Sequence, residues 1–330
     1  MKAALRDSYG PPEVVEVREV ERPTPKDDEV LVRVHAASVN RADLDYLGPR
    51  PGFMRPFIGL RAPRDPRMGI DVAGVVESVG SDVTGFRVGD RVFGDMFAFG
   101  SGAFAEYLSA PERAFAQIPD GLSFEIAATL PHSAILAIQG LRRRNGRTVQ
   151  PGDTVLIDGA SGNVGPFAVQ IAKSLGAEVT AVASAGKLDF VRSLGADHVL
   201  DYRKVDYTKA AERYDWILDT DSHHSIRAVR RALRPNGIYV TLGGTTWPLI
   251  QGMVVGPLIS LFSDRWSGLM LWWKPFDRDD LATVTDLIAA GKVRPVIDRR
   301  FPLSQVVEAL RWVADGHAVG KVVISEDAER

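Results

Sequence analysis

The stretch VLIDGASGNVGPFAVQIAKSLG, residues 155–176 of this 330-residue chain, places the strongest constraint on the fold. An apolar run typical of a buried strand leads into an amphipathic helical pattern through a turn that contains Gly159, Gly162 and Gly165. Glycine permits positive φ and lets a backbone approach a ligand closely. The helix start beyond the turn offers free N–H donors and a positive dipole end, and Pro166 there loses only an N–H that would have no helical partner. The turn predicts a pyrophosphate site.

After this turn, strands and helices alternate along the chain. EVTAVAS, HVLDY, WILDT and IYVTLGG have the character of buried strands, and helical patterns such as AGKLDFVRSLG separate them. This order is typical of a doubly wound parallel sheet, in which ligands bind at the carboxyl ends of the strands. A G-x-x-G-x-x-G pattern alone would also fit a plain strand–helix connection, but this context favours dinucleotide binding.

A chain of this length exceeds what one hydrophobic core usually organises, so two domains are expected. Up to about residue 120 it shows short β segments separated by turns, and the last residues return to β character. We predict an α/β protein in which a β-rich domain, residues 1–122 and 297–330, is interrupted by a dinucleotide-binding domain, residues 123–296. Ser123 is the expected cap of the first helix.

Composition excludes several classes of function. The charged fraction is 25%, the net charge is −2 and no basic block occurs, so neither nucleic acid nor an anionic membrane is an expected partner. No targeting segment and no membrane-spanning run are seen. The chain has no cysteine, which excludes disulfides and cysteine-ligated zinc and is compatible with a cytoplasmic protein. The six histidines show no metal-ligand spacing.

The end of the second strand of the nucleotide fold indicates which dinucleotide is bound. NAD-binding domains usually place Asp or Glu there for the ribose hydroxyls. This chain has Ala183 and Ser184 at that point, followed by Lys187. A hydroxyl and an ammonium would accept a 2′-phosphate that a carboxylate would repel, and Tyr202 could pack beside the adenosine phosphate. We predict NADPH as the cofactor, although Lys187 could also be a solvated residue of a first helical turn.

Several motifs resemble the medium-chain dehydrogenase/reductase superfamily, in particular its zinc-free, zeta-crystallin-like quinone oxidoreductase branch. They are GIDVAGVVESVGSDVTGFRVGDRVFG (69–94), GASGNVG, SLGADHVLDYR, LDTDSHHSIRAVRRALRPNGIYVTLGG and HAVGKVVIS, and together they extend over essentially the whole chain. The resemblance implies a GroES-like catalytic domain, a Rossmann-fold domain, a cofactor cleft at their junction and a homodimer. It also implies pyrophosphate contacts from Ser161, Gly162, Asn163, Val164 and Gly165, a 2′-phosphate site at Ser184, Lys187 and Tyr202, and Leu242 and Gly243 near the nicotinamide.

Zinc chemistry is not expected. Zinc-dependent members carry His-Glu where this chain has Ile70 and Asp71, and a cysteine ligand in the region of Ser38 to Asn40. Without a Lewis acid, an unactivated alcohol lacks a means of stabilising its alkoxide. No tyrosine is followed by lysine four residues later, which excludes the other common route to alcohols. Quinones and α,β-unsaturated carbonyls remain, because they accept hydride directly from a reduced nicotinamide.

Catalytic candidates lie in SVNRADLDYLG. By resemblance, Asn40 and Asp43 match an Asn-x-x-Asp motif beside the nicotinamide, although a turn and helix cap would explain the same residues. Related quinone reductases have a tyrosine five residues after that Asn, and here Tyr46 follows one position later. We interpret Tyr46 as a carbonyl hydrogen-bond donor. Two departures stand nearby, Leu136 in place of Thr and His132 in place of a small residue, where the histidine is either a proton donor or a packed residue.

The segment from Trp247 to Pro275 contains four of the six tryptophans. It fits a subunit interface, the lip of a site for a bulky acceptor or, less well, a membrane contact. We interpret the chain as a zinc-independent NADPH-dependent reductase of small quinones or α,β-unsaturated carbonyls. The alternatives are a reductase of acyl or polyketide-type enones, and a protein that binds NADPH as a sensor without turnover.

Overall fold

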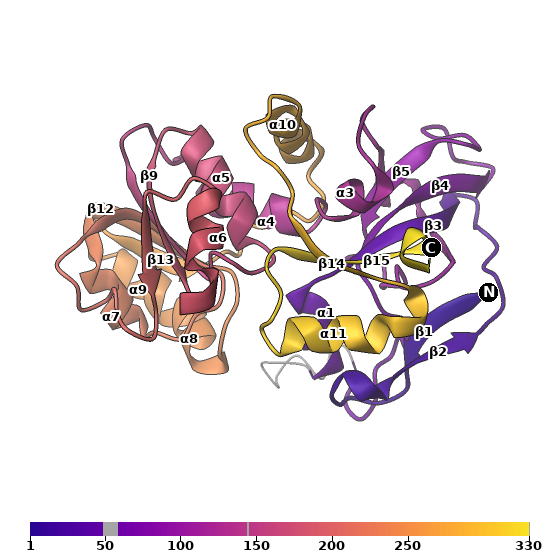
Figure 1. The fold of residues 1–330 in the computed structure, drawn as a ribbon, viewed down its shortest axis with the longest axis horizontal. Coiled ribbons are helices and arrows are strands. Elements are labelled where there is room, and N and C mark those ends of the chain that lie inside the picture. Colours follow the sequence, from indigo (N-terminus) through magenta and orange to yellow (C-terminus); the bar gives the residue numbers. More distant parts are fainter. Residues whose placement is uncertain (49–58, 144, 330) are drawn as a thin grey trace. The chain divides into compact units, whose positions relative to one another are not determined.

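The computed structural model describes residues 1–48, 59–143 and 145–329 (Figure 1). The chain divides into two compact units. Unit 1 comprises Met1–Ile135, Pro275–Leu281 and Ile297–Arg330, and unit 2 comprises Leu136–Lys274 and Ala282–Val296. Residues 123–135, which the sequence analysis placed in the nucleotide-binding domain, group with unit 1 because helix α3 (Phe124–Ala128) packs on the sheet of that unit. The exact domain limits remain a prediction.

Unit 1 is built on a seven-stranded sheet in the order β14-β15-β3-β4-β5-β7, with β6 also paired to β3. A separate β1–β2 hairpin and the helix α11 complete the unit. Apart from the parallel β14–β15 pair, neighbouring strands of this sheet are antiparallel. The strands are β1 (Lys2–Arg6), β2 (Val15–Glu19), β3 (Glu29–Val39), β4 (Asp71–Val79), β5 (Arg91–Asp95), β6 (Tyr107–Pro111), β7 (Phe115–Gln117), β14 (Ile297–Phe301) and β15 (Lys321–Ser325). The helices are α1 (Arg41–Leu47), α3 and α11 (Val306–Ala314).

Strand β3 lies at the centre of this sheet, and its register positions the candidate site. Ser38 lies opposite Asp71 of β4, and Val39 lies opposite Val322 of β15. Residues from the middle of the chain and from its C-terminal strand therefore meet at the end of β3, where α1 begins. Ser123 caps α3 as predicted, because its side chain accepts a hydrogen bond from the Ile126 N–H.

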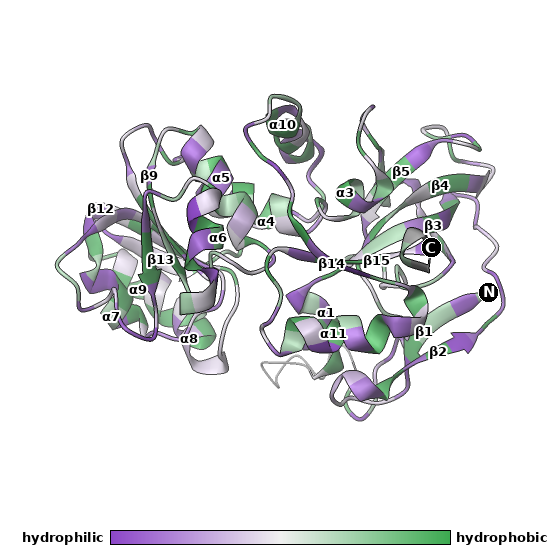
Figure 2. Ribbon diagram, in the orientation of Figure 1, coloured by the Kyte–Doolittle hydropathy of each residue, from purple (hydrophilic) through white to green (hydrophobic). Residues whose placement is uncertain are grey.

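Unit 2 is a six-stranded parallel sheet in the order β10-β9-β8-β11-β12-β13, which confirms the predicted doubly wound fold. Its central strands are hydrophobic, as the green of β9 in Figure 2 shows. Successive strands are added on one side of β8 up to β10 and then on its other side from β11, and ligands bind beside such a switch point. The strands are β8 (Thr154–Asp158), β9 (Glu178–Ala183), β10 (His198–Asp201), β11 (Tyr214–Asp219), β12 (Leu233–Thr241) and β13 (Trp266–Leu269). The helices are α5 (Gly165–Ser174), α6 (Leu188–Ser193), α7 (Ile226–Arg231), α8 (Thr246–Ile250) and α9 (Gly256–Ser260), while α4 (Ser133–Gly140) and α10 (Arg278–Ala289) run from one unit into the other.

The tryptophan-rich segment forms α8, a π-helical turn at Gln251–Val255, α9 and the edge strand β13. The Trp266 and Trp272 rings pack edge to face, with centroids 5.2 Å apart. Trp247 is 65% exposed, and the most exposed large apolar residues are Leu261 at 75% and Phe262 at 91%. The apolar surface of this segment therefore comes mainly from α9 and the turn after it.

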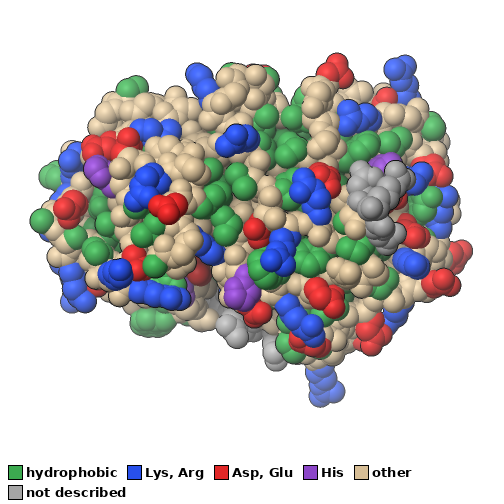
Figure 3. Space-filling model, in the orientation of Figure 1, with side chains coloured by type: hydrophobic (Ala, Val, Ile, Leu, Met, Phe, Trp, Pro, Cys, Tyr) green, Lys and Arg blue, Asp and Glu red, His purple; other side chains and the backbone are tan. Residues whose placement is uncertain are grey.

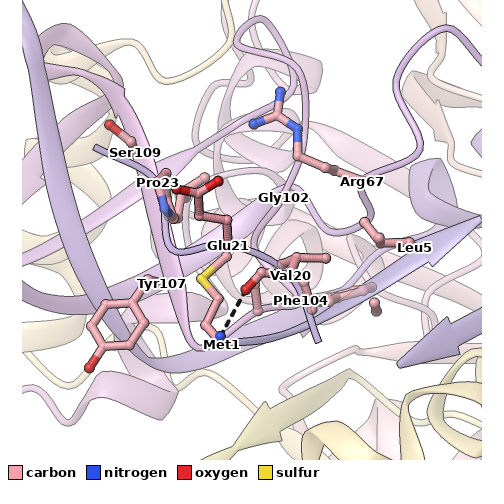
Figure 4. Close-up of a pocket in the computed structure, with 14 residues that line it drawn as sticks. Met1, Leu5, Val20, Glu21, Pro23, Arg67, Gly102, Phe104, Tyr107 and Ser109 are labelled. Atoms are coloured by element: carbon pink, nitrogen blue, oxygen red, sulfur yellow. Dashed lines mark hydrogen bonds between the residues drawn. The ribbon is translucent and has the colours of Figure 1, made fainter. Parts of the chain in front are cut away.

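A pocket of about 270 Å³ lies beside the β1–β2 hairpin of unit 1 (Figure 4). The Met1 ammonium donates to the Val20 carbonyl at its floor, and Phe104 and Leu108 supply much of its apolar wall. None of the predicted cofactor or catalytic residues lines it, so this pocket is separate from the candidate site. On the face drawn in Figure 3, basic and acidic side chains are interspersed. Within the described ranges, no helix is both long and apolar enough to cross a membrane.

Candidate functional site

The glycine-rich turn between β8 and α5 has the geometry that a pyrophosphate requires. Gly159 has φ of +76°, and a Cβ there would lie 2.2 Å from Thr220 Oγ1. A Cβ on Gly165 would lie 2.4 Å from the Gly159 carbonyl oxygen, so both positions must be glycine for packing. At Gly162, by contrast, the nearest such atom is 3.5 Å away, which leaves room above the turn. Helix α5, with Pro166 in its first turn, begins at Gly165 and directs its N-terminal end to this space.

The turn after β11 connects the two predicted cofactor turns of unit 2. Thr220 Oγ1 donates to the Asp158 carbonyl oxygen at 3.0 Å and so holds the start of the glycine turn. Two residues later the Ser222 N–H donates to the Gly243 carbonyl at 2.9 Å, and the Leu242 N–H donates to the Asp219 carbonyl. These bonds hold Leu242 and Gly243 close to the glycine turn. A dinucleotide whose pyrophosphate lies at the glycine turn would have its nicotinamide end near Leu242 and Gly243.

The predicted 2′-phosphate residues come together at the carboxyl ends of β9 and β10. Asp201 pairs with Ala183 in these parallel strands, and the Tyr202 N–H donates to the Ala183 carbonyl at 3.3 Å. Ser184 follows β9 directly, and Lys187 closes the short 3₁₀ turn after it. No carboxylate occupies the end of β9 itself, since the strand ends at Ala183 and continues into Ser184.

Arg203 is a candidate that the sequence analysis missed. It is exposed, and its guanidinium carbon lies 5.6 Å from the centroid of the Tyr202 ring. Arginine stacks on aromatic rings and binds phosphate with several N–H donors. Its position next to Tyr202 in DYRK was the available signal.

Two acids at the ends of β8 and β11 were also missed, the half-buried Asp158 and the fully buried Asp219. Asp158 and Asp219 lie directly opposite each other in the paired strands. Burial, followed by the charge of Asp219, raises the pKa of Asp158 well above its ordinary value. Burial also raises the pKa of Asp219 to about 6, against the hydrogen bond that its carboxylate accepts from Tyr239 Oη at 2.9 Å.

The predicted catalytic residues of unit 1 belong to a buried polar cluster around Lys321. The Lys321 ammonium donates to Asn40 Oδ1 at 2.5 Å and to Ser133 Oγ at 2.9 Å, and it lies 3.3 Å from Asp71 Oδ2. Asn40 Nδ2 donates to the same carboxylate oxygen at 2.8 Å, as does Ser38 Oγ. Zinc-dependent members of the superfamily carry zinc ligands in the segments that contain Ser38 and Asp71. In this chain hydrogen bonds join those two segments, and the Lys321 ammonium balances the charge of Asp71.

His132 enters this cluster from the start of α4. Its Nδ1 lies 3.2 Å from Asp95 Oδ2, and its backbone N–H donates to Asp71 Oδ1 at 3.0 Å. Burial alone would lower the pKa of His132, but the hydrogen bond and charge of Asp95, with the charge of Asp71, raise it. The Phe97 ring packs on His132 with centroids 5.7 Å apart. His132 is therefore a packed residue that is paired with Asp95.

Asp43 and Tyr46 lie one turn apart on α1. Asp43 Oδ2 accepts a hydrogen bond from the Asn40 N–H at 2.7 Å, which accounts for its capping role. Its other oxygen, Oδ1, is buried without a hydrogen-bond partner. Burial raises the pKa of Asp43 to about 7 and that of Tyr46 to about 12. Tyr46 is half-buried between Phe97, whose ring centroid is 6.1 Å away, and the Arg6 guanidinium at 5.9 Å.

The described part of the chain contains no group of three or more His, Asp or Glu side chains arranged to hold a metal ion. The predicted cofactor-binding residues, in contrast, all belong to unit 2. The open space at Gly162, the start of α5 and the basic side chains after β9 and β10 fit its pyrophosphate and adenosine ends.

Known proteins with similar sequences identify the family. Residues 26–120 match the family model described as the alcohol dehydrogenase GroES-like domain, and residues 194–324 match the one described as zinc-binding dehydrogenase. A chloroplast envelope quinone oxidoreductase homolog from Arabidopsis thaliana is 32% identical over 98% of both chains. The chain belongs to the quinone oxidoreductase branch of the medium-chain dehydrogenase/reductase superfamily.

Two further relatives of this quinone oxidoreductase chain are informative. An NADPH-dependent alkenal/one oxidoreductase from A. thaliana is 32% identical over 98% of this chain and 79% of its own length. The structure of the quinone oxidoreductase from Coxiella burnetii superposes with a TM-score of 0.86 at 29% identity, over 98% of this chain and 99% of that one. The chain is thus an oxidoreductase that uses a nicotinamide cofactor, with the GroES-like and Rossmann folds expected from its motifs.

Proposed function

We propose that this oxidoreductase is a zinc-independent, NADPH-dependent reductase of quinones or α,β-unsaturated carbonyls. The observation that carries the cofactor choice is the end of β9, where Ser184 and Lys187 stand without a carboxylate and Tyr202 and Arg203 lie alongside. A 2′-phosphate carries negative charge, which these donors and cations attract and which an acid at this point would repel.

Bound NADPH supplies the hydride, and the chain's own residues do the rest. The glycine turn and the first turn of α5 hold the pyrophosphate through Ser161, Gly162, Asn163, Val164 and Gly165. In unit 2, Leu242 and Gly243 would lie beside the nicotinamide. In unit 1, Asn40 and Asp43 would shape the catalytic floor. The Tyr46 phenol stays protonated because burial raises its pKa, so it can donate a hydrogen bond to the carbonyl of the acceptor.

Activated acceptors fit this site better than alcohols do. An alcohol substrate requires a cation or base that stabilises its alkoxide. The buried ammonium of Lys321 is already surrounded by Asn40, Ser133 and Asp71, and Lys321 has no exposed surface. A quinone or enone requires only the reduced cofactor and a hydrogen bond to its carbonyl, which the Tyr46 phenol would donate.

Fluorescence titration with NADPH and NADH, followed by addition of 1,4-benzoquinone or 3-penten-2-one, tests this function. We expect tighter binding of NADPH and rapid oxidation on addition of an acceptor, and the faster acceptor indicates which class is preferred. Tight binding without oxidation of either acceptor would contradict the reductase function and support a sensor. Tighter binding of NADH would contradict the role given to Ser184 and Lys187.

We also propose a homodimer formed through the edge of the unit 2 sheet. Among the described residues, strand β13 is an edge strand paired with β12, and Leu258, Leu261 and Phe262 expose apolar surface next to it. Large exposed apolar patches commonly mark protein interfaces. Light scattering should give twice the monomer mass for the wild type and a monomer for L261S/F262S. A monomeric wild type would contradict the dimer.

The location proposed for the protein is the cytoplasm. Named relatives act in chloroplasts as well, so the location does not follow from the family. The cysteine-free composition supports a reducing compartment without requiring it. Imaging of the fluorescently tagged chain tests the proposal, and a signal confined to an organelle or to membranes would contradict it.

A further inference from the structure

Arg6, the last residue of β1, is a buried cation that contacts no carboxylate in the described part of the chain. The residue is only 3% exposed. Its Nη1 donates to Met68 Sδ, a weak acceptor, at 2.8 Å, and its Nε has no hydrogen-bond partner among the described residues. A buried guanidinium without a carboxylate in contact lowers stability, so packing alone does not explain an arginine at this position.

Two other buried bases of unit 1, in contrast, are paired with acids. Lys321 Nζ lies 3.3 Å from Asp71 Oδ2, and His132 Nδ1 lies 3.2 Å from Asp95 Oδ2. These pairs balance the charges of their members inside the unit. Arg6 has no such contact, so its positive charge acts at longer range on the groups around it.

The acids nearest in effect to Arg6 are bonded elsewhere. Asp65 accepts from Arg67 Nε at 3.0 Å and from Arg67 Nη2 at 2.7 Å. Asp43 Oδ2 accepts from the Asn40 N–H, and its Oδ1 has no partner among the described residues. Neither acid is therefore bonded to the guanidinium. The groups whose charges act on it are Tyr9, Asp65, Tyr46 and Asp43.

The aromatic ring that the guanidinium faces is that of Tyr46. The guanidinium carbon of Arg6 lies 5.9 Å from the centroid of this ring. A cation at such a distance is attracted to the π electrons, most strongly where water is excluded. Burial raises the pKa of Tyr46 to about 12, and the charge of Arg6 acts in the opposite direction.

The hydroxyl of Tyr46 is available to a ligand. The residue is half-buried, and its Oη has no hydrogen-bond partner among the described residues. Arg6 itself is buried, so the phenol is the part of this pair that an acceptor can reach. Any effect of Arg6 on the acceptor therefore passes through Tyr46.

We propose that Arg6 is a positioning residue that makes Tyr46 a stronger hydrogen-bond donor to the oxygen of the reduced acceptor. The inference rests on the proposed function, in which Tyr46 donates to the acceptor carbonyl. Hydride transfer forms a C–H bond at the enone β-carbon and moves an electron pair to the carbonyl oxygen, so an enolate forms as NADPH becomes NADP⁺. Solvent then protonates the α-carbon.

The charge of Arg6 acts most strongly after the hydride has moved. The Tyr46 proton is then drawn toward the negative acceptor oxygen, and the phenol oxygen itself becomes more negative. The guanidinium beside the ring stabilises this state more than the complex with the neutral acceptor, which is the condition for a higher rate. An enolate oxygen is more basic than the oxygen of a hydroquinone anion, so Arg6 should matter more for enones than for quinones.

Steady-state kinetics with 3-penten-2-one and 1,4-benzoquinone tests this distinction. R6M keeps the length of the side chain without its charge, and its kcat with the enone should fall by about 30-fold. The loss with the quinone should be smaller, and the KM for NADPH should not change. R6K keeps the charge and should restore most of kcat. R18M removes an arginine of the same hairpin that pairs with Asp7 at the surface, and it should keep wild-type kinetics.

The double variant R6M/Y46F shows whether Arg6 acts through the phenol. Without the hydroxyl the charge of Arg6 has nothing to strengthen, so R6M/Y46F should have the same kcat as Y46F. If R6M lowered kcat as much in the Y46F background as in the wild type, the inference would be overturned.

Urea denaturation distinguishes positioning from a structural role. Because Arg6 contacts no carboxylate, R6M should be at least as stable as the wild type. A destabilised R6M that loses equal kcat with both acceptors would assign Arg6 a structural role and overturn the inference. NADPH binding, followed by fluorescence, shows that R6M is folded, and R6Q takes its place if R6M does not fold.

The outcomes separate this inference from the proposed function. A wild type that reduces acceptors while R6M keeps its kcat with the enone overturns the inference and leaves the reductase intact. A wild type that reduces neither acceptor overturns both.

Discussion

Lys321 Nζ donates a hydrogen bond of 2.5 Å to Asn40 Oδ1, although 281 residues separate them in the sequence. The contact exists because the C-terminal strand β15 pairs with β3 immediately before α1. Lys321, in the last strand of the chain, thus balances the charge of Asp71, the first residue of β4. This ion pair lies next to Asn40, where the candidate catalytic helix α1 begins. The packing of unit 1 and the arrangement of its candidate catalytic residues therefore depend on the same contact.

Replacing Lys321 should strongly destabilise unit 1. K321M keeps the length of the side chain but leaves the carboxylate of Asp71 buried without its cation, which typically costs about 3–5 kcal/mol. K209M is the matched control, because Lys209 is 77% exposed in its pair with Asp206, and such pairs contribute less than about 1 kcal/mol. Urea denaturation measures both. Similar small losses for the two variants would show that the buried ammonium is not needed, whereas K321M/D71N should recover part of the loss.

Replacing Asp158 should stabilise the protein in a pH-dependent way. Because its folded pKa is raised, this acid contributes its stability at low pH and loses it as the pH rises through the folded pKa. D158N resembles the protonated acid at every pH. Its unfolding free energy should therefore be close to that of the wild type near pH 4 and exceed it near pH 8. Chemical denaturation at both pH values provides the comparison, and an equal difference at both would contradict the buried-pair interpretation.

Gly159 should tolerate no side chain. G159A adds both the strain of φ +76° and a Cβ 2.2 Å from Thr220 Oγ1, so we expect loss of NADPH binding and a destabilisation of about 1–3 kcal/mol. G152A serves as control, because Gly152 has φ of +85° but no atom within 4 Å of its Cβ position. It should lose about 1 kcal/mol from strain alone and bind NADPH normally. Normal NADPH affinity in G159A would contradict the pyrophosphate site.

Arg203 and Lys187 should distinguish NADPH from NADH. Removing one charged donor to a 2′-phosphate typically costs about 1.5–3 kcal/mol, so R203A and K187A should each weaken NADPH binding by about tenfold or more. The affinity for NADH, which lacks that phosphate, should stay the same. K204A removes an exposed neighbouring charge and should change neither affinity. Fluorescence titration of the three variants with both cofactors measures these affinities. If R203A and K187A weakened the binding of NADPH and NADH equally, the 2′-phosphate would bind elsewhere.

The parts of the fold that depend on local pattern could be predicted from the sequence. The alternation of strands and helices was enough to predict the parallel sheet of unit 2, and the glycine turn stands where that pattern put it. The cluster around Lys321 could not be predicted in the same way, because it depends on the register of β15, β3 and β4. Nothing local to Lys321 indicates that it is buried beside Asn40.

Other differences have similar physical causes. The tryptophans drew attention to segment 247–275 in the sequence, but its most exposed apolar side chains are Leu261 and Phe262, while Trp266 and Trp272 pack on each other. The acids Asp158 and Asp219 looked like ordinary strand ends, and only their pairing shows that they share one buried environment. Sequence spacing carries no information on contacts of this kind.

Transfer of a label from the cofactor to the acceptor is the most direct test of the central claim, reduction of an activated carbonyl by NADPH. The purified enzyme is incubated with NADPH deuterated at C4 on the transferred face and with 3-penten-2-one, and the product is examined by mass spectrometry and NMR. The proposed function predicts 2-pentanone with one deuterium on the former β-carbon, formed faster with NADPH than with NADH. Oxidised cofactor without a deuterated ketone, together with no hydroquinone formed when 1,4-benzoquinone replaces the enone, would contradict it.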